Sequence, residues 1–328
     1  MRVGIIGAGF FGEKHAQALV EAEDFSVVAS CRSDESAARE FAARYGGRAY
    51  SSYREVLDDP DVEAVVIATP HATHEEIAVA AAGAGKHTLL EKPMSHTLAS
   101  CEAIVRAFED GPVLLLGHVT RFSRAFRLAK EMIAAGEIGE PVAGHASMRK
   151  RWWEPNRRDW HLDRAQGGGV LLTGGIHALD RLMWLLDQPV VSVAAQFDTR
   201  FHEQAADDLG VVFLRFAAGA VGTVHSIGYA DGVPDHDTVV IGTAGMLRVH
   251  SVAGVHVGKG ESWSHVPGSG SAEWLPDALV AQWRALAAAA RTGRPTPVDG
   301  REGLRVMRVL FAAERSSQLR QEVILPEA

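Results

Sequence analysis

Several features common in secreted, membrane-bound or nucleic-acid-binding proteins are scarce in this sequence. It has only two cysteines, Cys31 and Cys101, which are too few for a disulfide framework and indicate a reducing compartment. It has no apolar run of membrane-spanning length. Its 33 lysines and arginines are outnumbered by 41 aspartates and glutamates, and the formal net charge is −8. We therefore expect neither a membrane nor nucleic acid as a partner, and a cytoplasmic location, since a strand predicted from residue 2 leaves no room for a signal peptide.

The glycine-rich start of the chain is its most informative feature. An apolar strand is predicted at Val3–Ile6, and the three following glycines have the GxGxxG spacing. The first permits a tight turn, the second lets the backbone approach a pyrophosphate, and the third lets the next helix pack closely on the sheet. Unpaired N–H groups at the helix start attract the anion. A glycine-rich turn in another α/β protein is the alternative. The predicted dinucleotide-binding residues here are Gly7, Gly9, Phe10, Phe11 and Gly12.

The residues after the next predicted strand, Phe25–Ser30, bear on which dinucleotide is bound. An NAD-binding chain usually has a carboxylate here for the ribose hydroxyls, whereas this chain has Arg32 and Ser33. A guanidinium beside a hydroxyl suits a 2′-phosphate, so we favour NADP as the cofactor, with NAD possible. In the alternative, Arg32 is a solvated surface residue and Asp34 binds the ribose. Ser33 could also be the N-cap of a helix that begins at Asp34.

Apolar strands and helical patterns alternate along the first third of the chain, as in a doubly wound parallel sheet. We predict an α/β protein whose amino-terminal Rossmann domain covers residues 1–121. The further strands predicted in this domain are Val62–Thr69, one that ends at Leu90, and Val113–Gly117. Helices are predicted at Glu75–Ala84 and Thr97–Glu109, with a capping box of Ser52 and Glu55.

The pattern changes from about residue 121 onward. One helix is predicted at Arg124–Ala135 and a second near residues 170–186, and most of the remainder predicts strands. We therefore expect a carboxy-terminal α+β domain over residues 122–328, with an open, mainly antiparallel sheet. An uncovered sheet face has to be buried, which favours a homo-oligomer. Gly258–Ala272 is predicted to be a flexible loop. The predicted strands are Val142–Met148, Val190–Phe197, Gly210–Phe216, Val221–Tyr229, Thr238–Gly242 and Leu247–His250.

Four motifs occur in an order and at separations that resemble the GFO/IDH/MocA oxidoreductases. They are ATPHATH at 68–74, EKP at 91–93, GHVTRF at 117–122 and GGGVLLTGGIHALD at 167–180. The resemblance covers nearly the whole chain. It implies a Rossmann domain, a second domain that binds substrate and assembles a homodimer or homotetramer through its open sheet, and hydride transfer between a nicotinamide and the CH–OH carbon of a sugar or cyclitol.

The EKP motif supplies the first candidate catalytic residue. Glu91 to Pro93 follow a predicted parallel strand, and open α/β sheets place ligands at the carboxyl ends of their strands. Pro93 disfavours a helical conformation at Lys92 and keeps that residue extended. Lys92 can hydrogen-bond the reacting oxygen and stabilise the alkoxide as hydride leaves the carbon. In the alternative, Lys92 is a solvated lysine paired with Glu91.

The second candidate catalytic residue is His177. Thr173, His177 and Asp180 fall at i, i+4 and i+7 of a predicted helix and share one face. The resemblance matches His177 to a residue that contacts substrate and moves a proton. Many family members have an aspartate where this chain has Thr173, so catalysis would rest on Lys92 and His177. Asp180 is alternatively an anchor for the helix or for a neighbouring arginine. The predicted substrate contacts are Thr173, Trp160, Asp180 and Arg121.

The resemblance implies that two further segments contribute to the site. Residues 149–164 are rich in arginine and tryptophan, and the resemblance places Trp160 and His161 against the nicotinamide ribose or the sugar, while Trp152 and Trp153 fit ordinary packing equally well. The two histidines of the ATPHATH motif lie three apart, but no further ligand joins them, so we expect no metal. The predicted cofactor contacts in these segments and at EKP are Thr69, Pro70, His71, His74, Glu91, Lys92, Trp160 and His161.

The sequence therefore predicts an NADP(H)-dependent oxidoreductase that acts on a sugar, cyclitol or related polyol. Two alternatives stay open. One is a glycosidase of the same family, which oxidises and re-reduces a hydroxyl around a tightly bound dinucleotide. The other is a non-catalytic dinucleotide sensor, for which Thr173 is the only sequence argument.

Overall fold

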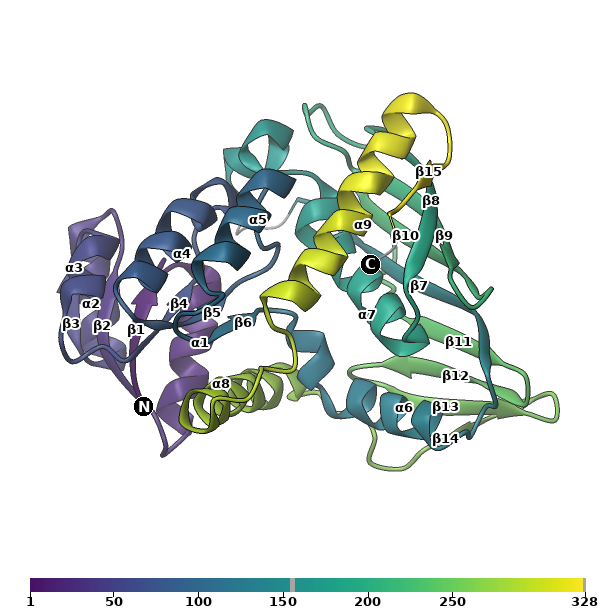
Figure 1. Cartoon of the computed structure of the whole chain (residues 1–328), viewed down its shortest axis with the longest axis horizontal. Coiled ribbons are helices and arrows are strands. Elements are labelled where there is room, and N and C mark those ends of the chain that lie inside the picture. Colours follow the sequence, from purple (N-terminus) through teal and green to yellow (C-terminus); the bar gives the residue numbers. More distant parts are fainter. Residues whose placement is uncertain (154–156, 327–328) are drawn as a thin grey trace. The chain divides into compact units, whose positions relative to one another are not determined.

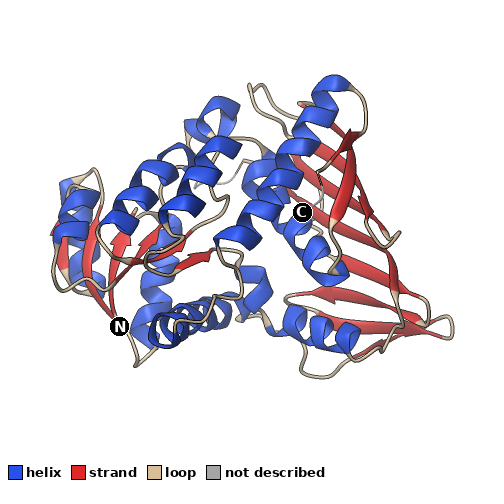
Figure 2. Cartoon of the chain, viewed as in Figure 1, coloured by secondary structure: helices blue, strands red, loops and turns tan. Residues whose placement is uncertain are grey.

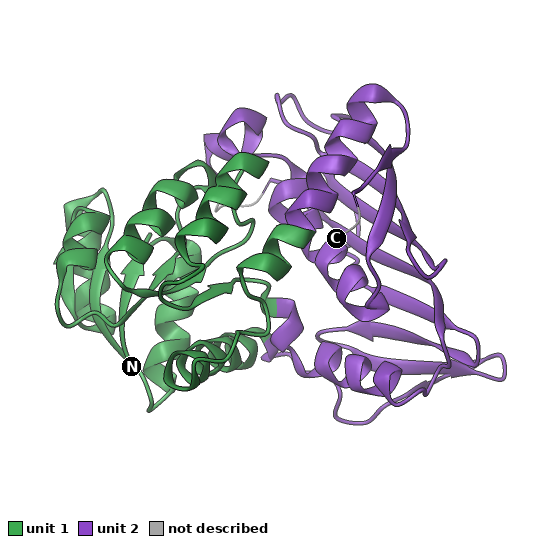
Figure 3. Cartoon of the chain, in the orientation of Figure 1, with its two compact units in different colours: residues 1–119, 275–305 green, residues 120–274, 306–328 purple. Residues whose placement is uncertain are grey.

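The computed structural model describes residues 1–153 and 157–326, and it divides into two compact units (Figure 3). The first unit comprises residues 1–119 and 275–305, and the second comprises residues 120–274 and 306–328. The sequence predicted two domains, each one continuous segment, that meet between residues 121 and 122, and the observed division differs from that prediction. The reason is that the chain returns to the first unit over residues 275–305, which the sequence pattern did not indicate.

The first unit is built on a six-stranded parallel sheet with strand order β3-β2-β1-β4-β5-β6 (Figure 1). Its central strands are apolar on both faces and buried, as in β4, because helices cover a parallel sheet on both sides. The predicted doubly wound Rossmann sheet is thereby confirmed. The strands are β1 (Arg2–Ile6), β2 (Ser26–Cys31), β3 (Arg48–Tyr50), β4 (Ala64–Ile67), β5 (His87–Leu90) and β6 (Leu114–Leu116).

Several helices of the first unit begin at polar side-chain caps. Ser52 accepts a hydrogen bond from the N–H of Arg54, and Glu55 accepts from the N–H of Ser52 at 3.0 Å, so the predicted capping box is confirmed. Thr97 caps α5 through the N–H of Ser100. The helices are α1 (Phe10–Glu21), α2 (Glu35–Tyr45), α3 (Tyr53–Asp58), α4 (His74–Gly83), α5 (Leu98–Ala107), α8 (Trp274–Thr292) and the first residues of α9 (Gly300–Leu319).

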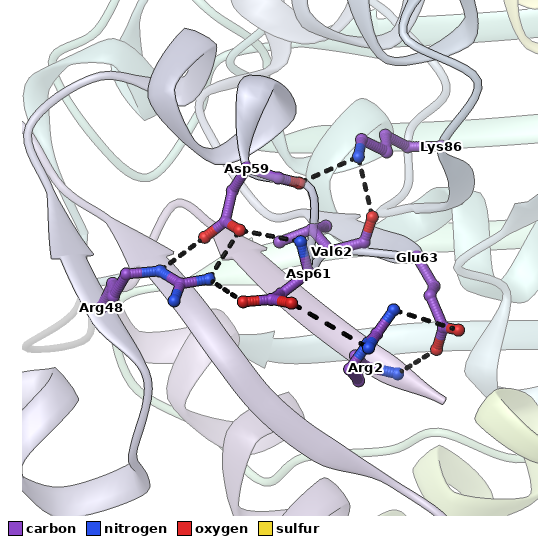
Figure 4. A network of polar contacts seen from close by, with 7 residues as sticks. All are labelled: Arg2, Arg48, Asp59, Asp61, Val62, Glu63 and Lys86. Carbon is purple, nitrogen blue, oxygen red and sulfur yellow. Dashed lines mark hydrogen bonds and ion pairs between the residues drawn. The ribbon is translucent and has the colours of Figure 1, made fainter.

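A network of charged side chains joins the amino-terminal ends of the strands (Figure 4). Arg48 donates to both carboxylate oxygens of Asp59, at 2.8 and 2.6 Å, and to Asp61 at 2.7 Å. Lys86 donates to the carbonyl groups of Asp59 and Val62. Burial alone raises the pKa of Asp59, but the hydrogen bonds from Arg48 and the Asp61 N–H outweigh it and lower that pKa. Ligands bind at the carboxyl ends of the strands in such folds. This network stabilises the opposite edge of the sheet.

The second unit contains a nine-stranded sheet with order β14-β13-β12-β11-β7-β10-β9-β8-β15 (Figure 2). Among the strands that the structure describes here, only β7 and β10 pair in parallel, so the predicted open, mainly antiparallel sheet is confirmed. The strands are β7 (Pro141–Arg151), β8 (Val190–Asp198), β9 (Leu209–Phe216), β10 (Val221–Tyr229), β11 (Thr238–Gly242), β12 (Gly245–His250), β13 (Gly254–Lys259), β14 (Ser262–His265) and β15 (Val323–Ile324).

Helices lie against one face of this sheet. α6 (Arg124–Ala134) packs on β12 and β13, and α7 (Ile176–Leu186) packs on β7, β10 and β11. The later part of α9 docks on β8, where Ser316 and Ser317 accept the N–H groups of Ala195 and Phe197. Along β10 buried and half-buried residues alternate, as expected for a sheet with one packed face.

One sequence prediction in this unit is wrong. Gly258–Ala272 was expected to be a flexible loop, but its first part completes β13 and contains all of β14. Pairing with the neighbouring strands, such as Met246 with Gly258, decides the conformation there despite the weak strand propensity of glycine. In the part of the chain that the structure describes, no helix is both long enough and apolar enough to cross a membrane.

Candidate functional site

The first group of candidate residues surrounds the turn between β1 and α1. Gly7 has φ +91°, and a Cβ there would lie 2.6 Å from the carbonyl oxygen of Ala68. A Cβ on Gly12 would lie 2.2 Å from the carbonyl oxygen of Gly7. The N–H groups of Gly7 and Ala8 donate to the carbonyl of Cys31 at the end of β2, at 3.3 and 3.1 Å. The turn is thus fixed by its two neighbouring strands, and only glycine fits at these two positions.

The start of α1 has the features of a phosphate-binding helix terminus. A Cβ on Gly9 would meet nothing within 4 Å, so the backbone is open at that point. Gly9 is the N-cap, and no side chain caps the first turn, which leaves the N–H groups there for a ligand. Uncapped N–H groups at the positive end of a helix bind phosphate. These observations fit the pyrophosphate of a dinucleotide.

The residues predicted to select the dinucleotide lie at the carboxyl end of β2. Arg32 and Ser33 are exposed, and the Arg32 guanidinium lies 3.5 Å from the carbonyl oxygen of Ala8 in the glycine turn. Asp34 is the N-cap of α2 and accepts the N–H of Ala37 at 3.1 Å. The alternative that Ser33 caps this helix is therefore wrong by one residue. The carboxylate of Asp34 already has a structural hydrogen bond, whereas Arg32 is available at the surface beside the turn.

The turn after β4 contains four of the predicted cofactor contacts. Thr73 donates to Thr69 Oγ1 and to the carbonyl of Pro70, both at 2.8 Å. His71 begins a short helical segment, and His74 begins α4 directly after it. His74 is fully buried. Its two ring nitrogens lie 3.0 Å from the carbonyl oxygens of Thr69 and Pro93. His74 thus holds this turn against the EKP turn, and its role in cofactor binding stays a prediction.

The ring of His74 lies between opposing electrostatic influences. Burial lowers its pKa, and the carbonyl oxygens of Thr69, Pro93 and Met94 oppose that effect. The lowering by burial is the larger effect, which favours the neutral ring. A neutral ring donates through only one nitrogen at a time, so one of the two turns receives the stronger contact.

The EKP motif follows β5, at the same sheet edge as the glycine turn. Glu91 is buried, and its Oε1 lies 2.9 Å from Nε2 of His15, while its Oε2 accepts the N–H of Lys92 at 3.2 Å. Lys92 is half-buried, and its peptide bond to Pro93 is cis. The sequence analysis missed His15. Its place on the apolar face of the predicted first helix was the one available signal, and that position is equally typical of a core residue.

The second group of candidate residues lies in the second unit, around the start of α7. Thr173 belongs to a π-helical turn, Leu171–Gly175, and His177 and Asp180 belong to α7. The expectation that these residues share one helix face assumed a single regular α-helix. That assumption is wrong, because the hydrogen bonds of a π-helical turn span five residues. A Cβ on Gly175 would lie 2.4 Å from Oγ of Ser226. Close packing on β10 therefore accompanies the widened turn.

Asp180 and Arg121 are paired with each other inside the second unit. The Arg121 guanidinium donates to Oδ1 of Asp180 at 2.9 and 2.5 Å, and both residues are buried. The guanidinium also lies over the ring of Trp184, 5.6 Å from its centroid. The alternative in which Asp180 anchors a neighbouring arginine is confirmed. A direct contact of either residue with substrate stays a prediction.

The aromatic segment before α7 divides into structural and candidate site residues. Trp152 is fully buried and donates to Gln204 at 2.8 Å, which confirms its packing role, while Trp153 is half exposed. Residues 154–156 lie outside the described part of the chain. Trp160 is half-buried and stacks on His161, with ring centroids 3.6 Å apart. His161 is buried and accepts the N–H of Arg158, so its ring is held in place behind Trp160.

Asp207 holds the start of the π-turn and was not identified from the sequence. It accepts the N–H of Leu171 at 2.9 Å, and a Cβ on Gly169 would lie 2.1 Å from its other oxygen. Burial raises the pKa of Asp207 to about 7, although the Leu171 N–H opposes that shift. Because the folded-state pKa exceeds the unfolded value, the folded protein binds this proton more tightly. Its contribution to stability is therefore lost as pH rises from about 4 towards 7.

Replacing Asp207 with asparagine is expected to remove this loss. The amide oxygen still accepts the Leu171 N–H, but the side chain no longer ionises. At pH 8 we expect the variant to be more stable by about 2 kcal/mol, below the full value for such a shift because the side chain is only partly buried. At pH 4.5 most of this difference should be absent. The free energy of unfolding measured in urea at both pH values checks this, with the exposed Asp187→Asn as the control. A difference that is equal at both pH values would contradict it.

Among the described residues, no group of three or more histidines, cysteines, aspartates or glutamates is arranged to hold a metal ion. The first unit brings the glycine turn, Arg32, Thr69 and Glu91 to the carboxyl edge of one sheet, after β1, β2, β4 and β5. That edge is where open α/β sheets bind their ligands. The second unit carries the other candidates on α7, on its π-turn and in the short helical segment Asp159–Leu162.

Comparisons with known proteins agree with this organisation. A model described as an oxidoreductase family with an NAD-binding Rossmann fold matches residues 1–118. A model described as the GFO/IDH/MocA C-terminal domain matches residues 126–248. Together they match most of both units.

Individual relatives extend over the chain at moderate identity. The myo-inositol 2-dehydrogenase of Thermotoga maritima is 28% identical over 100% of this chain and 99% of its own length. The scyllo-inositol 2-dehydrogenase (NAD(+)) of Bacillus subtilis is 30% identical over 81% of this chain and 80% of its own. The solved structure of GenD2 from gentamicin A biosynthesis, in complex with NAD, is 28% identical with a TM-score of 0.88, covering 100% of this chain and 97% of GenD2.

Proposed function

This chain belongs to the GFO/IDH/MocA family of oxidoreductases, and from that premise we propose that it transfers hydride between NADP(H) and the CH–OH carbon of a sugar, cyclitol or related polyol. The single observation that carries the proposal is the uncapped start of α1 behind the glycine turn, at the same sheet edge as Lys92. The substrate class is supported by relatives that are named inositol dehydrogenases.

The choice of NADP rests on Arg32. Its guanidinium is exposed beside the glycine turn, while the nearby Asp34 carboxylate is used as the N-cap of α2. Arg32 can hold a 2′-phosphate with paired, charge-assisted hydrogen bonds, and Ser33 can add a hydroxyl. The Bacillus subtilis scyllo-inositol 2-dehydrogenase is named for NAD(+), and GenD2 was solved with NAD, so this preference would distinguish the chain from those two proteins.

We assign the chemical roles to Lys92 and His177. The bound nicotinamide supplies the acceptor or donor of the hydride. Lys92 donates a hydrogen bond to the reacting oxygen and stabilises its developing charge. His177 takes up or returns the hydroxyl proton, as an imidazole can near neutral pH. Thr173 binds a substrate hydroxyl, and the stacked Trp160 offers an apolar face to the C–H side of a sugar ring.

Assembly is part of the proposal. In the described part of the second unit, helices lie against one face of the sheet and the residues of the other face along β10 are half-buried, and such a face is normally covered by another surface. A second copy of the chain, in a homodimer or homotetramer, is the occupant that we propose.

A substrate panel tests the proposed function. Purified protein is mixed with sugars and inositols, with NAD and NADP in parallel, and absorbance is followed at the band of the reduced nicotinamide. We expect turnover with at least one polyol and a higher kcat/KM with NADP. Stoichiometric bound dinucleotide with no net turnover would favour the glycosidase instead. If the parent acts on no polyol but the Thr173→Asp variant does, the sensor is favoured.

A further inference from the structure

Three buried side chains from separate segments of the first unit form a chain of hydrogen bonds that ends at Lys92. Trp283 on α8 donates its indole N–H to Nδ1 of His15 on α1, at 3.1 Å. Nε2 of His15 lies 2.9 Å from Oε1 of Glu91, whose Oε2 accepts the Lys92 N–H at 3.2 Å. Trp283 and His15 are 0% exposed and Glu91 is 5% exposed, so solvent does not compete for these contacts.

The donors and acceptors give this chain one direction. An indole nitrogen only donates, so Nδ1 of His15 must be the accepting nitrogen. The hydrogen of the neutral ring is therefore on Nε2, where it donates to the Glu91 carboxylate. The opposite tautomer would set two N–H groups against each other at Trp283 and leave Glu91 without a donor from the ring. Trp283 and the Glu91 carboxylate thus favour the same tautomer, in which His15 donates to Glu91.

Packing confines each member to its place. A Cβ on Gly117 would lie 2.9 Å from the carboxylate carbon of Glu91, so the backbone just after β6 closes directly on this side chain. The His15 ring meets the ring of Phe11 at a centroid distance of 5.5 Å and the ring of Trp283 at 5.9 Å, both edge to face. The Glu91 carboxylate is therefore enclosed, and its second oxygen is held against the main chain of Lys92.

We propose that Trp283 and His15 are positioning residues that act through Glu91 to fix the main chain of Lys92. The inference rests on the proposed role of Lys92. Because both residues are fully buried, they can hold Glu91 in place but do not themselves contact a ligand that arrives from solvent. This also gives a purpose to the return of the chain into the first unit, since α8 supplies the indole that orients α1 and the EKP turn.

Substitutions that remove one donor at a time test the proposal. Trp283→Phe keeps an aromatic ring but removes the indole N–H, and Phe25→Leu is the matched control because Phe25 packs on Trp283 with no hydrogen bond to it. We expect kcat to fall at least tenfold in Trp283→Phe, with KM and the dinucleotide Kd changed less than about threefold. Phe25→Leu should keep the parental kcat.

A second pair of variants covers the case in which Trp283→Phe folds poorly. His15→Gln retains an N–H donor for Glu91, whereas His15→Leu does not. We expect His15→Gln to recover much of the kcat that His15→Leu loses. If both lose the same amount, or if Trp283→Phe and Phe25→Leu behave alike, Trp283 and His15 only fill space and the proposal is overturned.

A spectroscopic readout separates this inference from the proposed function. The ¹⁵N shifts of His15, assigned by comparison with His15→Gln, report which ring nitrogen carries the hydrogen. We expect Nε2–H in the parent and in Phe25→Leu, and a changed Nδ1 shift in Trp283→Phe, where Nδ1 loses the indole donor. Nδ1–H in the parent overturns the inference even in an active enzyme. If the parent has the expected tautomer but oxidises no polyol, the proposed function fails, and the positioning role fails with it while the hydrogen-bond chain stands.

Discussion

Lys92→Met is expected to abolish turnover while dinucleotide affinity stays within about tenfold, which corresponds to about 1.4 kcal/mol. Methionine has a similar length but lacks the charge and the N–H donors. The reacting oxygen would lose the group that stabilises its charge, and a proton-transfer or charge-stabilising group typically contributes a factor of about 10² to 10⁴. The glycine turn and the uncapped start of α1 are untouched, so the dinucleotide should still bind.

The matched control is Lys86→Met, the same substitution in the same unit. Lys86 precedes β5 and donates to the carbonyl groups of Asp59 and Val62, whereas the EKP turn follows the carboxyl end of that strand. It should lower stability without lowering kcat. Measurements of kcat by absorbance and of dinucleotide Kd by fluorescence titration decide the matter. Comparable turnover in Lys92→Met and the parent would remove Lys92 from the mechanism.

Arg32→Ala is expected to weaken NADP binding by about 30- to 100-fold, as expected when charge-assisted bonds worth about 2 to 3 kcal/mol are lost. NAD lacks the 2′-phosphate, so its Kd should change less than about threefold. Among the described residues, Arg32 forms no ion pair with a carboxylate, and its removal should leave the fold intact.

Titrations of both dinucleotides against Arg32→Ala and the control Arg39→Ala test the selector. Arg39 is an exposed arginine on α2 that pairs with Glu35 within its own helix. The control should bind NADP and NAD as the parent does. Equal weakening of the two dinucleotides in Arg32→Ala would show that this residue contacts a part common to both, and the preference for NADP would have to be abandoned.

Much of the fold follows from local sequence patterns. Val221–Tyr229 and Thr238–Gly242 have the same bounds in the prediction and in the structure, because each apolar segment is followed closely by a glycine-containing turn. The strand at β14 is different, since Ser262–His265 is exposed throughout and gains its conformation from pairing with β13. The return of α8 to the first unit also depends on contacts distant in sequence, which no local pattern encodes.

The candidate site was predictable to the extent that its motifs are local. The glycine turn and the EKP turn each depend on a few consecutive residues after a strand, so spacing was sufficient to find them. His15 and Trp283 are 268 positions apart, and each alone resembles a core residue. The π-turn at Thr173 depends on Asp207 and on packing against β10, which helical periodicity does not reveal.

The most direct test of the account is a crystal structure with NADP and the polyol identified by the substrate panel. The claim at its centre is that one amine and one imidazole serve the same hydroxyl. We expect Lys92 Nζ and one ring nitrogen of His177 each within about 3.2 Å of that oxygen. A bound polyol whose reacting hydroxyl contacts neither group, or only one of them, would contradict the account.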